Sequence, residues 1–101
     1  MHKILVLMST YNGAPYLIKQ IESVFLQDKC NVTLAVADDC STDDTLSILK
    51  NCRNIYSNII IVNNSSNLGY PANIYNLIRK VSLDNFDYIA YSDQDDFFMP
   101  N

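Results

Sequence analysis

Glycine and proline are scarce in this chain of 101 residues, which contains two of the first and three of the second. So few of them exclude a flexible linker and a collagen-like or low-complexity segment, and no repeat of solenoid period is visible. Lysine and arginine together number only seven, and the formal net charge is −4. This balance argues against general nucleic-acid binding, because neutralising phosphates requires clustered cations.

Cysteine is also scarce, with only Cys30, Cys40 and Cys52 present. An odd number without a CxxC pair indicates neither a disulfide framework nor a zinc site, and reduced thiols in a cytosol fit best. The first apolar run, residues 4–8, is not followed by a small-residue cleavage site. No stretch approaches the ~20 residues of a membrane span. We therefore expect neither secretion nor membrane spanning of this segment.

The residues that are present predict one compact domain over residues 1–101, because a hydrophobic content of 49% is enough for a single core. Apolar runs of strand length occur at residues 4–8, 32–37, 59–62 and 88–91. Between them, apolar residues recur at helical spacing: Leu17, Ile21, Val24 and Phe25, then Leu46, Ile48 and Leu49, then Ile74, Leu77, Ile78 and Val81.

This alternation predicts an α/β fold in which a mostly parallel sheet lies between two layers of helices. The first helix is expected to end near Gln27, and Pro71 suits the first turn of the third. Ligands of such sheets bind beyond the carboxyl ends of the strands, near the point where the strand order reverses. The polar clusters of the sequence follow those ends.

Two clusters follow the first two strands. In Ser9-Thr10-Tyr11-Asn12-Gly13, an aromatic ring beside small polar groups could stack on a heterocyclic base, although a simple turn explains the same residues. The second cluster covers residues 38–45 and begins with Asp38-Asp39, and in it Asp39 could accept a hydrogen bond from a pyrimidine N–H. Ser41 and Asp44 resemble a capping box that begins the second helix, with Asp43 in a helix-starting role.

Asn67-Leu68-Gly69 follows the third strand. Gly69 would permit a positive φ or a close approach of the backbone to a ligand, and a turn that starts the next helix is the competing interpretation.

The run Asp93-Gln94-Asp95-Asp96 follows the fourth strand. Two carboxylates ~6 Å apart repel each other by about 3 kcal/mol at an effective dielectric near 20, and a bound cation relieves this cost. Hard oxygen ligands suit Mg²⁺ or Mn²⁺ and leave coordination positions for diphosphate oxygens, whereas zinc is disfavoured. The competing interpretation is an acidic surface loop without metal.

Taken together and in this order, the four clusters resemble the donor-binding half of family 2 glycosyltransferases, over essentially the whole chain. The resemblance implies a fold of the GT-A type and a nucleotide-diphosphate sugar as donor. It also implies transfer to an acceptor hydroxyl with metal assistance, by an inverting mechanism. The context that it implies is bacterial surface-polysaccharide synthesis on the cytoplasmic side, including the inner face of the membrane.

The resemblance also assigns roles to residues. Thr10 and Tyr11 would line the base pocket, Asn12 would belong to the donor-binding residues beside them, and Asp39 would bind the base. Asn67 and Gly69 would shape the wall near the ribose and the diphosphate. In the Asp-x-Asp motif, Asp93 would serve the ribose or the metal, Asp95 would coordinate Mn²⁺ or Mg²⁺, and Asp96 is a weaker candidate.

The sequence departs from the family pattern at two places. Tyr70-Pro71-Ala72-Asn73 stands where many members carry an Arg-Asn pair further along. The chain also stops at Asn101, where such enzymes continue into the acceptor-binding half with the general base. The 101-residue chain is therefore expected to bind donor weakly and turn over little, and an exposed edge on the last strand could drive self-association.

The sequence Ser92-Asp93-Gln94-Asp95-Asp96 is similar to the corresponding motif of rhamnosyltransferase-like members. A dTDP-sugar is therefore expected as a donor alongside a UDP-sugar. Two other functions remain open. A phosphoacceptor signalling domain also gathers carboxylates at strand ends, but it would place an acid pair after the first strand. A non-catalytic nucleotide-binding module would keep the base pocket without transferring a group.

Overall fold

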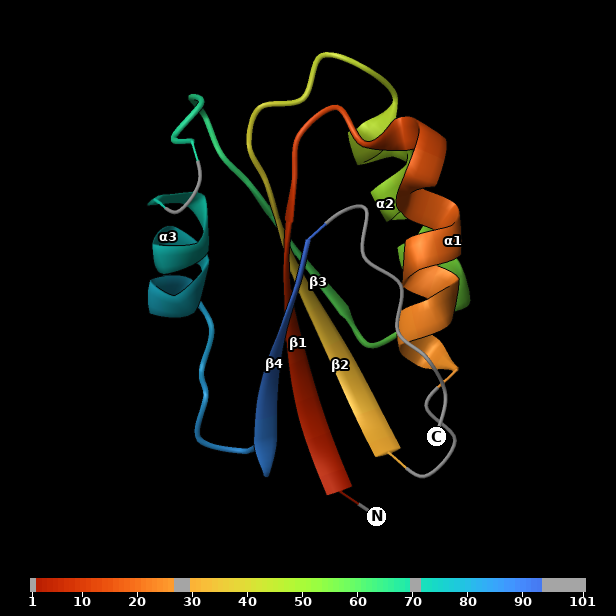
Figure 1. Cartoon of the computed structure of the whole chain (residues 1–101), viewed down its shortest axis with the longest axis vertical. Helices are drawn as coiled ribbons and strands as arrows, with labels where there is room; N and C mark the ends of the chain where they lie inside the picture. Colours follow the sequence, from red (N-terminus) through yellow and green to blue (C-terminus); the bar gives the residue numbers. More distant parts are fainter. Residues whose placement is uncertain (1, 27–29, 70–71, 94–101) are drawn as a thin grey trace.

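The computed structural model describes residues 2–26, 30–69 and 72–93, and in them strands and helices alternate along the chain (Figure 1). The strands are β1 (His2–Thr10), β2 (Cys30–Asp38), β3 (Ile59–Asn63) and β4 (Tyr88–Asp93). The helices are α1 (Ala14–Phe25), α2 (Thr45–Ile55) and α3 (Ala72–Lys80). Every predicted strand is present and extends beyond the apolar run that predicted it. Pro71, expected in the first turn of the third helix, lies outside the described residues, as does Gln27.

The strands form one parallel sheet in the order β3-β2-β1-β4. The chain moves outward from β1 through β2 to β3 and then returns past β1 to form β4 on its other side. The strand order therefore reverses between β1 and β4, which is where open α/β sheets bind their ligands. This arrangement confirms the predicted α/β class with a parallel sheet.

Helices cover both faces of the sheet, with α1 and α2 on one face and α3 on the other (Figure 1). Val6 and Met8 of β1 pack in the same apolar cluster as Leu17 of α1, whereas Leu5 and Leu7 pack in the cluster of α3. This alternation follows from the two-residue period of a strand. Each fully buried aliphatic side chain of these clusters contributes about 1.5–3 kcal/mol to stability by leaving water.

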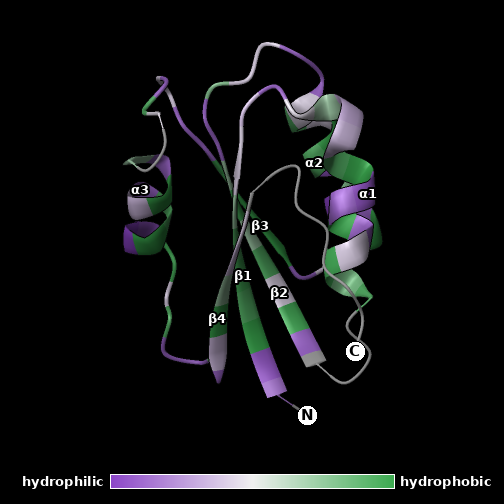
Figure 2. Cartoon of the chain, in the orientation of Figure 1, coloured by the Kyte–Doolittle hydropathy of each residue, from purple (hydrophilic) through white to green (hydrophobic). Residues whose placement is uncertain are grey.

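Hydrophobic residues are concentrated in the strands and on the inner sides of the helices (Figure 2). The loops that follow β1, β2 and β3, drawn at the top of the view, are coloured mainly from hydrophilic to neutral (Figure 2). In the part of the chain that the structure describes, no helix is long and apolar enough to cross a bilayer. Cys40 is an exposed free thiol and Cys52 a buried one.

Candidate functional site

The carboxyl ends of the four strands lie level with one another. Asp38 at the end of β2 is in register with Thr10 of β1 on one side and with Asn63 of β3 on the other. Asp93 at the end of β4 is in register with Ser9 of β1. The clusters that follow β1, β2 and β3 therefore meet at one edge of the sheet, as the sequence predicted, and β4 ends at the same edge.

The loops that follow β1 and β2 are tied together by Asn12. Its Oδ1 accepts hydrogen bonds from the backbone N–H groups of Thr42, at 2.8 Å, and of Asp43, at 3.3 Å. Asn12 has a φ of 49°, a left-handed conformation that asparagine tolerates better than most residues. Its own N–H donates to Ser41 Oγ at 2.9 Å. Asn12 therefore acts in the fold as the clamp between the two loops.

The expected capping box of Ser41 and Asp44 is wrong. Helix α2 begins at Thr45 with Asp44 at the N-cap position, and the Asp44 side chain makes no capping hydrogen bond. Asp43 takes that role instead, because its Oδ1 accepts from the Thr45 N–H at 3.0 Å and from the Thr45 hydroxyl. The hydrogen bond from the Thr45 side chain holds the pKa of Asp43 below its ordinary value.

Ser41 serves the buried carboxylate of Asp38 rather than a helix. Asp38 is 1% exposed, and it accepts hydrogen bonds from the Ser41 hydroxyl at 2.6 Å and the Ser41 N–H at 3.1 Å. The Thr10 hydroxyl donates to the same carboxylate at 2.8 Å. Thr10 is itself buried, so its side chain supports the floor of the site, whereas Tyr11 beside it is 45% exposed.

Asp39 organises the loop that follows β3. Its Oδ1 accepts from the Leu68 N–H at 2.7 Å and from Asn64 Nδ2 at 3.1 Å, and its Oδ2 accepts from the Gly69 N–H at 2.8 Å. The side chain is only 4% exposed. Burial raises the pKa of Asp39, but the hydrogen bonds from Leu68, Asn64 and Gly69 outweigh it and leave the pKa below its ordinary value. Asp39 is thus an ionised carboxylate in a site of low exposure.

Gly69 needs its glycine for backbone reasons. Its φ of 73° lies in the left-handed region, which confirms one of the two roles foreseen for it, and a Cβ built there would meet no atom within 4 Å. Asn67 stabilises the same turn, because its Oδ1 accepts from the Gly69 N–H at 3.0 Å. The structure therefore brings Asp39, Asn67 and Gly69 together.

Asn64 and Asn73 are site residues that the sequence did not single out as a pair. Both are buried, and they are hydrogen-bonded to each other through Asn64 Nδ2 and Asn73 Oδ1. Asn73 Nδ2 donates to Ser9 Oγ at 2.6 Å and to the Ala37 carbonyl at 3.0 Å. One sequence signal was available, since Asn73 stands four residues before the buried Leu77 and so occupies the core-facing side of α3.

A second buried amide supports the end of β4. Gln20 of α1 is fully buried, and its Nε2 donates to Ser92 Oγ at 2.9 Å, one residue before Asp93. Its Oε1 has no hydrogen-bond partner within the described part of the chain. Gln20 stands one helical turn after the buried Leu17, so a polar residue on a core-facing position was again the signal.

The predicted metal ligands are only partly covered. The backbone of Asp93 ends β4, but its side chain, Gln94, Asp95, Asp96 and Pro100 lie outside the described residues. Among the side chains that the structure does describe, no group of three or more His, Cys, Asp or Glu could hold a metal ion. The metal site at Asp93 and Asp95 stays a prediction.

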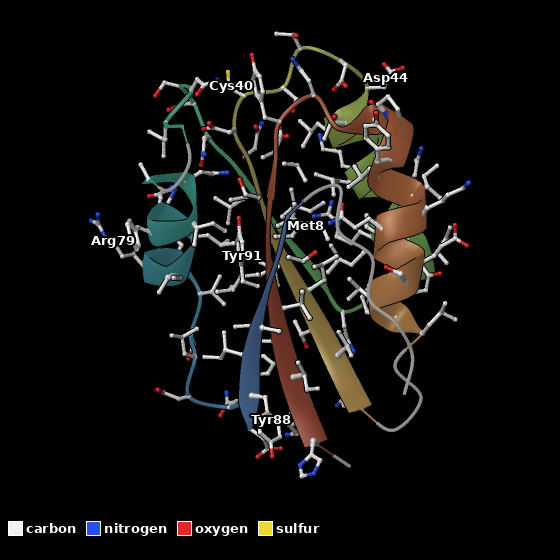
Figure 3. The ribbon with its side chains drawn as sticks, in the orientation of Figure 1. Met8, Cys40, Asp44, Arg79, Tyr88 and Tyr91 are labelled. Carbon is white, nitrogen blue, oxygen red and sulfur yellow. The ribbon has the colours of Figure 1, made fainter. Side chains whose placement is uncertain are left out.

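Cys40 and Asp44 mark the two sides of the loop after β2, at the end of the molecule opposite Tyr88 (Figure 3). Cys40 has a φ of 65°, so the residue directly after Asp39 also adopts a left-handed conformation. Chemically, this end of the sheet presents an exposed aromatic ring, a buried ionised carboxylate and a strand end that leads into an acidic run. An exposed ring and a hydrogen-bond acceptor suit a ligand with a flat heterocycle that can stack and donate an N–H.

Comparisons with known proteins agree with this description. Solved structures of GT-A glycosyltransferases share the fold, so the architecture is that of a nucleotide-sugar transferase. The chain belongs to glycosyl transferase family 2, whose family model matches residues 5–101. This assignment disfavours the phosphoacceptor signalling domain.

Two relatives illustrate the range of the family. The dTDP-rhamnosyl transferase RfbG of Shigella flexneri is 40% identical over 93 residues, which are 90% of this chain and 32% of that protein. The poly(ribitol-phosphate) beta-N-acetylglucosaminyltransferase TarS of Staphylococcus aureus is 33% identical over 99 residues, which are 96% of this chain and 17% of that protein. The chain thus spans about a third or less of the length of these relatives.

The solved structure of residues 1–349 of S. aureus TarS in complex with UDP superimposes with a TM-score of 0.81 at 28% identity, covering 94% of this chain and 28% of that one. The mannosyltransferase PcManGT of Pyrobaculum calidifontis, solved with GDP-Man and Mn²⁺, superimposes with a TM-score of 0.80 at 21% identity, over 91% of this chain and 27% of that one. The second likeness concerns the fold alone.

Proposed function

We propose that this chain is the donor-binding part of a glycosyltransferase that uses a UDP- or dTDP-sugar. The observation that carries the proposal is the convergence of all four strand ends on one edge, with Asp39 buried and ionised among them. Family membership supplies the reaction class, and RfbG and TarS are named for a rhamnosyl and an N-acetylglucosaminyl transferase.

The hydrogen bonds of Asp39 favour a pyrimidine over guanine. A carboxylate offers about four lone-pair positions, and three N–H donors of the protein already use Asp39. One position on Oδ2 is left, which matches the single N3–H of uracil or thymine. Guanine presents adjacent N1–H and N2–H donors that would need both carboxylate oxygens. Tyr11, Asn12 and Thr10 would form the rest of the base pocket, with Asn67 and Gly69 at its wall.

The acidic run would serve the diphosphate. Oxygen ligands such as those of Asp93 and Asp95 suit Mg²⁺ or Mn²⁺, and the end of β4 stands at the reversal of strand order. A divalent ion bound there would neutralise the departing diphosphate. On the protein side, Gln20 and Ser92 hold the strand that leads into this run.

We propose further that transfer inverts the anomeric carbon and that the general base is not among these 101 residues, since the relatives are about three times as long or longer. The isolated chain then binds donor and turns over little, as would a non-catalytic nucleotide-binding module. A cytoplasmic location, including the inner membrane face, and a role in surface-polysaccharide synthesis belong to the same proposal. Robust sugar transfer by the isolated chain would contradict it.

The edge of β4 bears on how the isolated chain behaves. Among the described strands, β4 pairs only with β1, and it exposes Tyr88, Ile89 and Tyr91. We propose that this edge lets the isolated chain associate with itself. Light scattering should then give a mass that rises with concentration, and a constant monomer mass would argue against it.

Calorimetric titration of UDP, dTDP and GDP with and without Mn²⁺ tests the donor site. We expect UDP or dTDP to bind in a metal-dependent manner and GDP to bind more weakly. Asp95→Ala should remove the metal dependence, and Asp39→Ala should weaken the preference between bases. Nucleotide binding that is indifferent to both substitutions would place the site elsewhere and overturn the proposal.

A further inference from the structure

The amide groups of Asn73, Asn64 and Asn76 form one chain of hydrogen bonds whose direction is set by a backbone carbonyl. The Ala37 carbonyl can only accept, so Asn73 must turn its Nδ2 toward it, at 3.0 Å. The Oδ1 of Asn73 then faces Asn64 and accepts from Asn64 Nδ2. Because a primary amide has its donor and acceptor on opposite sides, each orientation dictates the next.

The second N–H of Asn64 Nδ2 is directed at Asp39 Oδ1, at 3.1 Å. On the other side of the same amide, Asn64 Oδ1 accepts from Asn76 Nδ2 at 3.2 Å. The backbone of Asn64 is fixed as well, because its N–H donates to the Asp38 carbonyl at 2.9 Å. Asn64 therefore cannot reverse its amide without losing the bonds to Asn73, Asp39 and Asn76 together.

The chain of amides links three elements. Asn73 and Asn76 belong to α3, Asn64 follows β3, and the Ala37 carbonyl belongs to β2. Asn73 and Asn64 are 0% and 6% exposed, so water does not compete for these bonds. A buried polar network in which every amide orientation is determined gives Asp39 a donor that is already in place before any ligand arrives.

We propose that Asn64, oriented by Asn73 and Asn76, is a positioning residue that keeps Asp39 a pure acceptor and thereby selects uracil or thymine over cytosine. The inference rests on the proposed function, in which Asp39 meets the N3 position of the base. Uracil and thymine carry a proton on N3 and can donate from it, whereas cytosine presents a lone pair at N3 and carries its donor on N4 instead. An ionised Asp39 repels that lone pair, and a protonated Asp39 would accommodate it.

Other ionisable groups belong to the elements around Asp39. Asp38 and Cys40 flank Asp39 in the chain, and Asp38 turns to Thr10 and Ser41. Lys80 of α3 lines a groove together with Asn64 and Asn76. Tyr11 stands on the loop after β1.

Asn64→Asp tests the inference with little change of shape. The substitution replaces the N–H that faces Asp39 by an oxygen about 3.1 Å away, and two carboxylates at that distance do not both ionise near neutral pH. Asn58→Asp makes the same change of charge at an exposed position near the amino end of β3 and is the matched control.

Two readings on the whole 101-residue chain are needed. Carboxyl ¹³C NMR gives the pKa of Asp39 without any nucleotide, and we expect Asn64→Asp to raise the pKa of this pair while Asn58→Asp leaves Asp39 unchanged. NMR titration gives the affinities for UDP and CDP. We expect the wild type to favour UDP by about tenfold or more, and Asn64→Asp to remove most of that preference.

Each outcome decides one claim. An Asp39 pKa that Asn64→Asp leaves unchanged would overturn the inference, whatever the nucleotides do. Failure of the wild type to bind UDP would contradict the proposed donor site and, with it, the selection between bases. Should Asn64→Asp not fold, Asn76→Leu removes the bond that holds Asn64 Oδ1, and a UDP-to-CDP ratio equal to that of the wild type would then overturn the inference.

Discussion

The carboxyl and amino ends of the sheet use polar side chains in opposite ways. At the carboxyl end, Thr10, Asp38, Asp39, Asn64 and Asn73 are all buried and hydrogen-bonded to one another or to the backbone. At the amino end, a groove is lined in part by Lys3, Asn31 and Asn58. All three of these polar residues are exposed.

The polar contacts of charged side chains at the amino end are exposed to water. Its one ion pair among the described residues joins His2 Nδ1 and Asp87 Oδ2 at 3.9 Å, with side chains 65% and 55% exposed. Exposed pairs of this kind contribute little because water competes for them. The two ends therefore differ in that the carboxyl end buries its polar side chains and hydrogen-bonds them, whereas the amino end leaves them in water.

Asp38→Ala should produce the largest loss of stability among the changes considered. It would leave the Thr10 hydroxyl and the Ser41 N–H without their acceptor in a buried site, at a cost of about 2–4 kcal/mol. Urea unfolding monitored by circular dichroism measures the change. A loss no greater than that of Asp87→Ala would remove the distinction between the two ends.

Asn12→Ala should cost less, about 1–2 kcal/mol, because it removes the acceptor for Thr42 and Asp43 and places an alanine at a φ of 49°. Asn12→Gly separates the two causes, since glycine accepts that φ without strain. We expect Asn12→Gly to be the more stable of the two variants by urea unfolding. The reverse order would mean that the backbone of the clamp is not strained.

Acid should lower the stability of the fold in part through Asp39. Because the folded-state pKa of Asp39 lies below its ordinary value, the unfolded chain binds a proton that the folded chain does not. The stability from Asp39 is therefore complete above about pH 5 and is lost as the pH falls through the folded-state pKa. Urea midpoints of Asp39→Asn should fall less between about pH 5 and pH 3 than those of the wild type. Parallel curves would contradict the shift.

Asp87→Ala should have the smallest effect, below about 0.5 kcal/mol, because the ion pair with His2 is exposed. The carboxylate of Asp87 also accepts from the Lys3 N–H at 2.8 Å, but in an exposed setting where water replaces it. Thermal unfolding with Lys50→Ala as a second surface substitution provides the comparison. A large destabilisation would show that the exposed polar contacts at the amino end also stabilise the fold, against the contrast drawn between the two ends.

Sequence reasoning predicted the elements that depend on local pattern. The four strands and the apolar faces of the helices follow from periodicity, and the meeting of the polar clusters follows from parallel topology. The exact start of α2 did not follow. Ser41 satisfies the usual capping pattern, but its hydroxyl donates to Asp38 instead of serving the helix. The positive φ of Gly69 was one of two roles that the sequence allowed.

The buried amides could not be predicted in the same way. Asn64 sits in a run of polar residues that resembles an ordinary turn, and its partners Asp39 and Asn73 are 25 and 9 residues away in the chain. Gln20 interrupts an apolar helix face, and its partner Ser92 is 72 residues away. Their positions on core-facing sides of helices could have identified Gln20 and Asn73 as buried, but not what they bind.

Chemical-shift mapping of UDP on the isotope-labelled chain, with Mg²⁺ present, tests most directly whether the carboxyl end is the donor site. We predict that the backbone amides of Tyr11, Asp39 and Gly69 shift on titration, while those of Lys3, Asn31 and Asn58 at the amino end stay in place. Shifts confined to the amino-end groove, with Asp39 and Gly69 unaffected, would contradict the account.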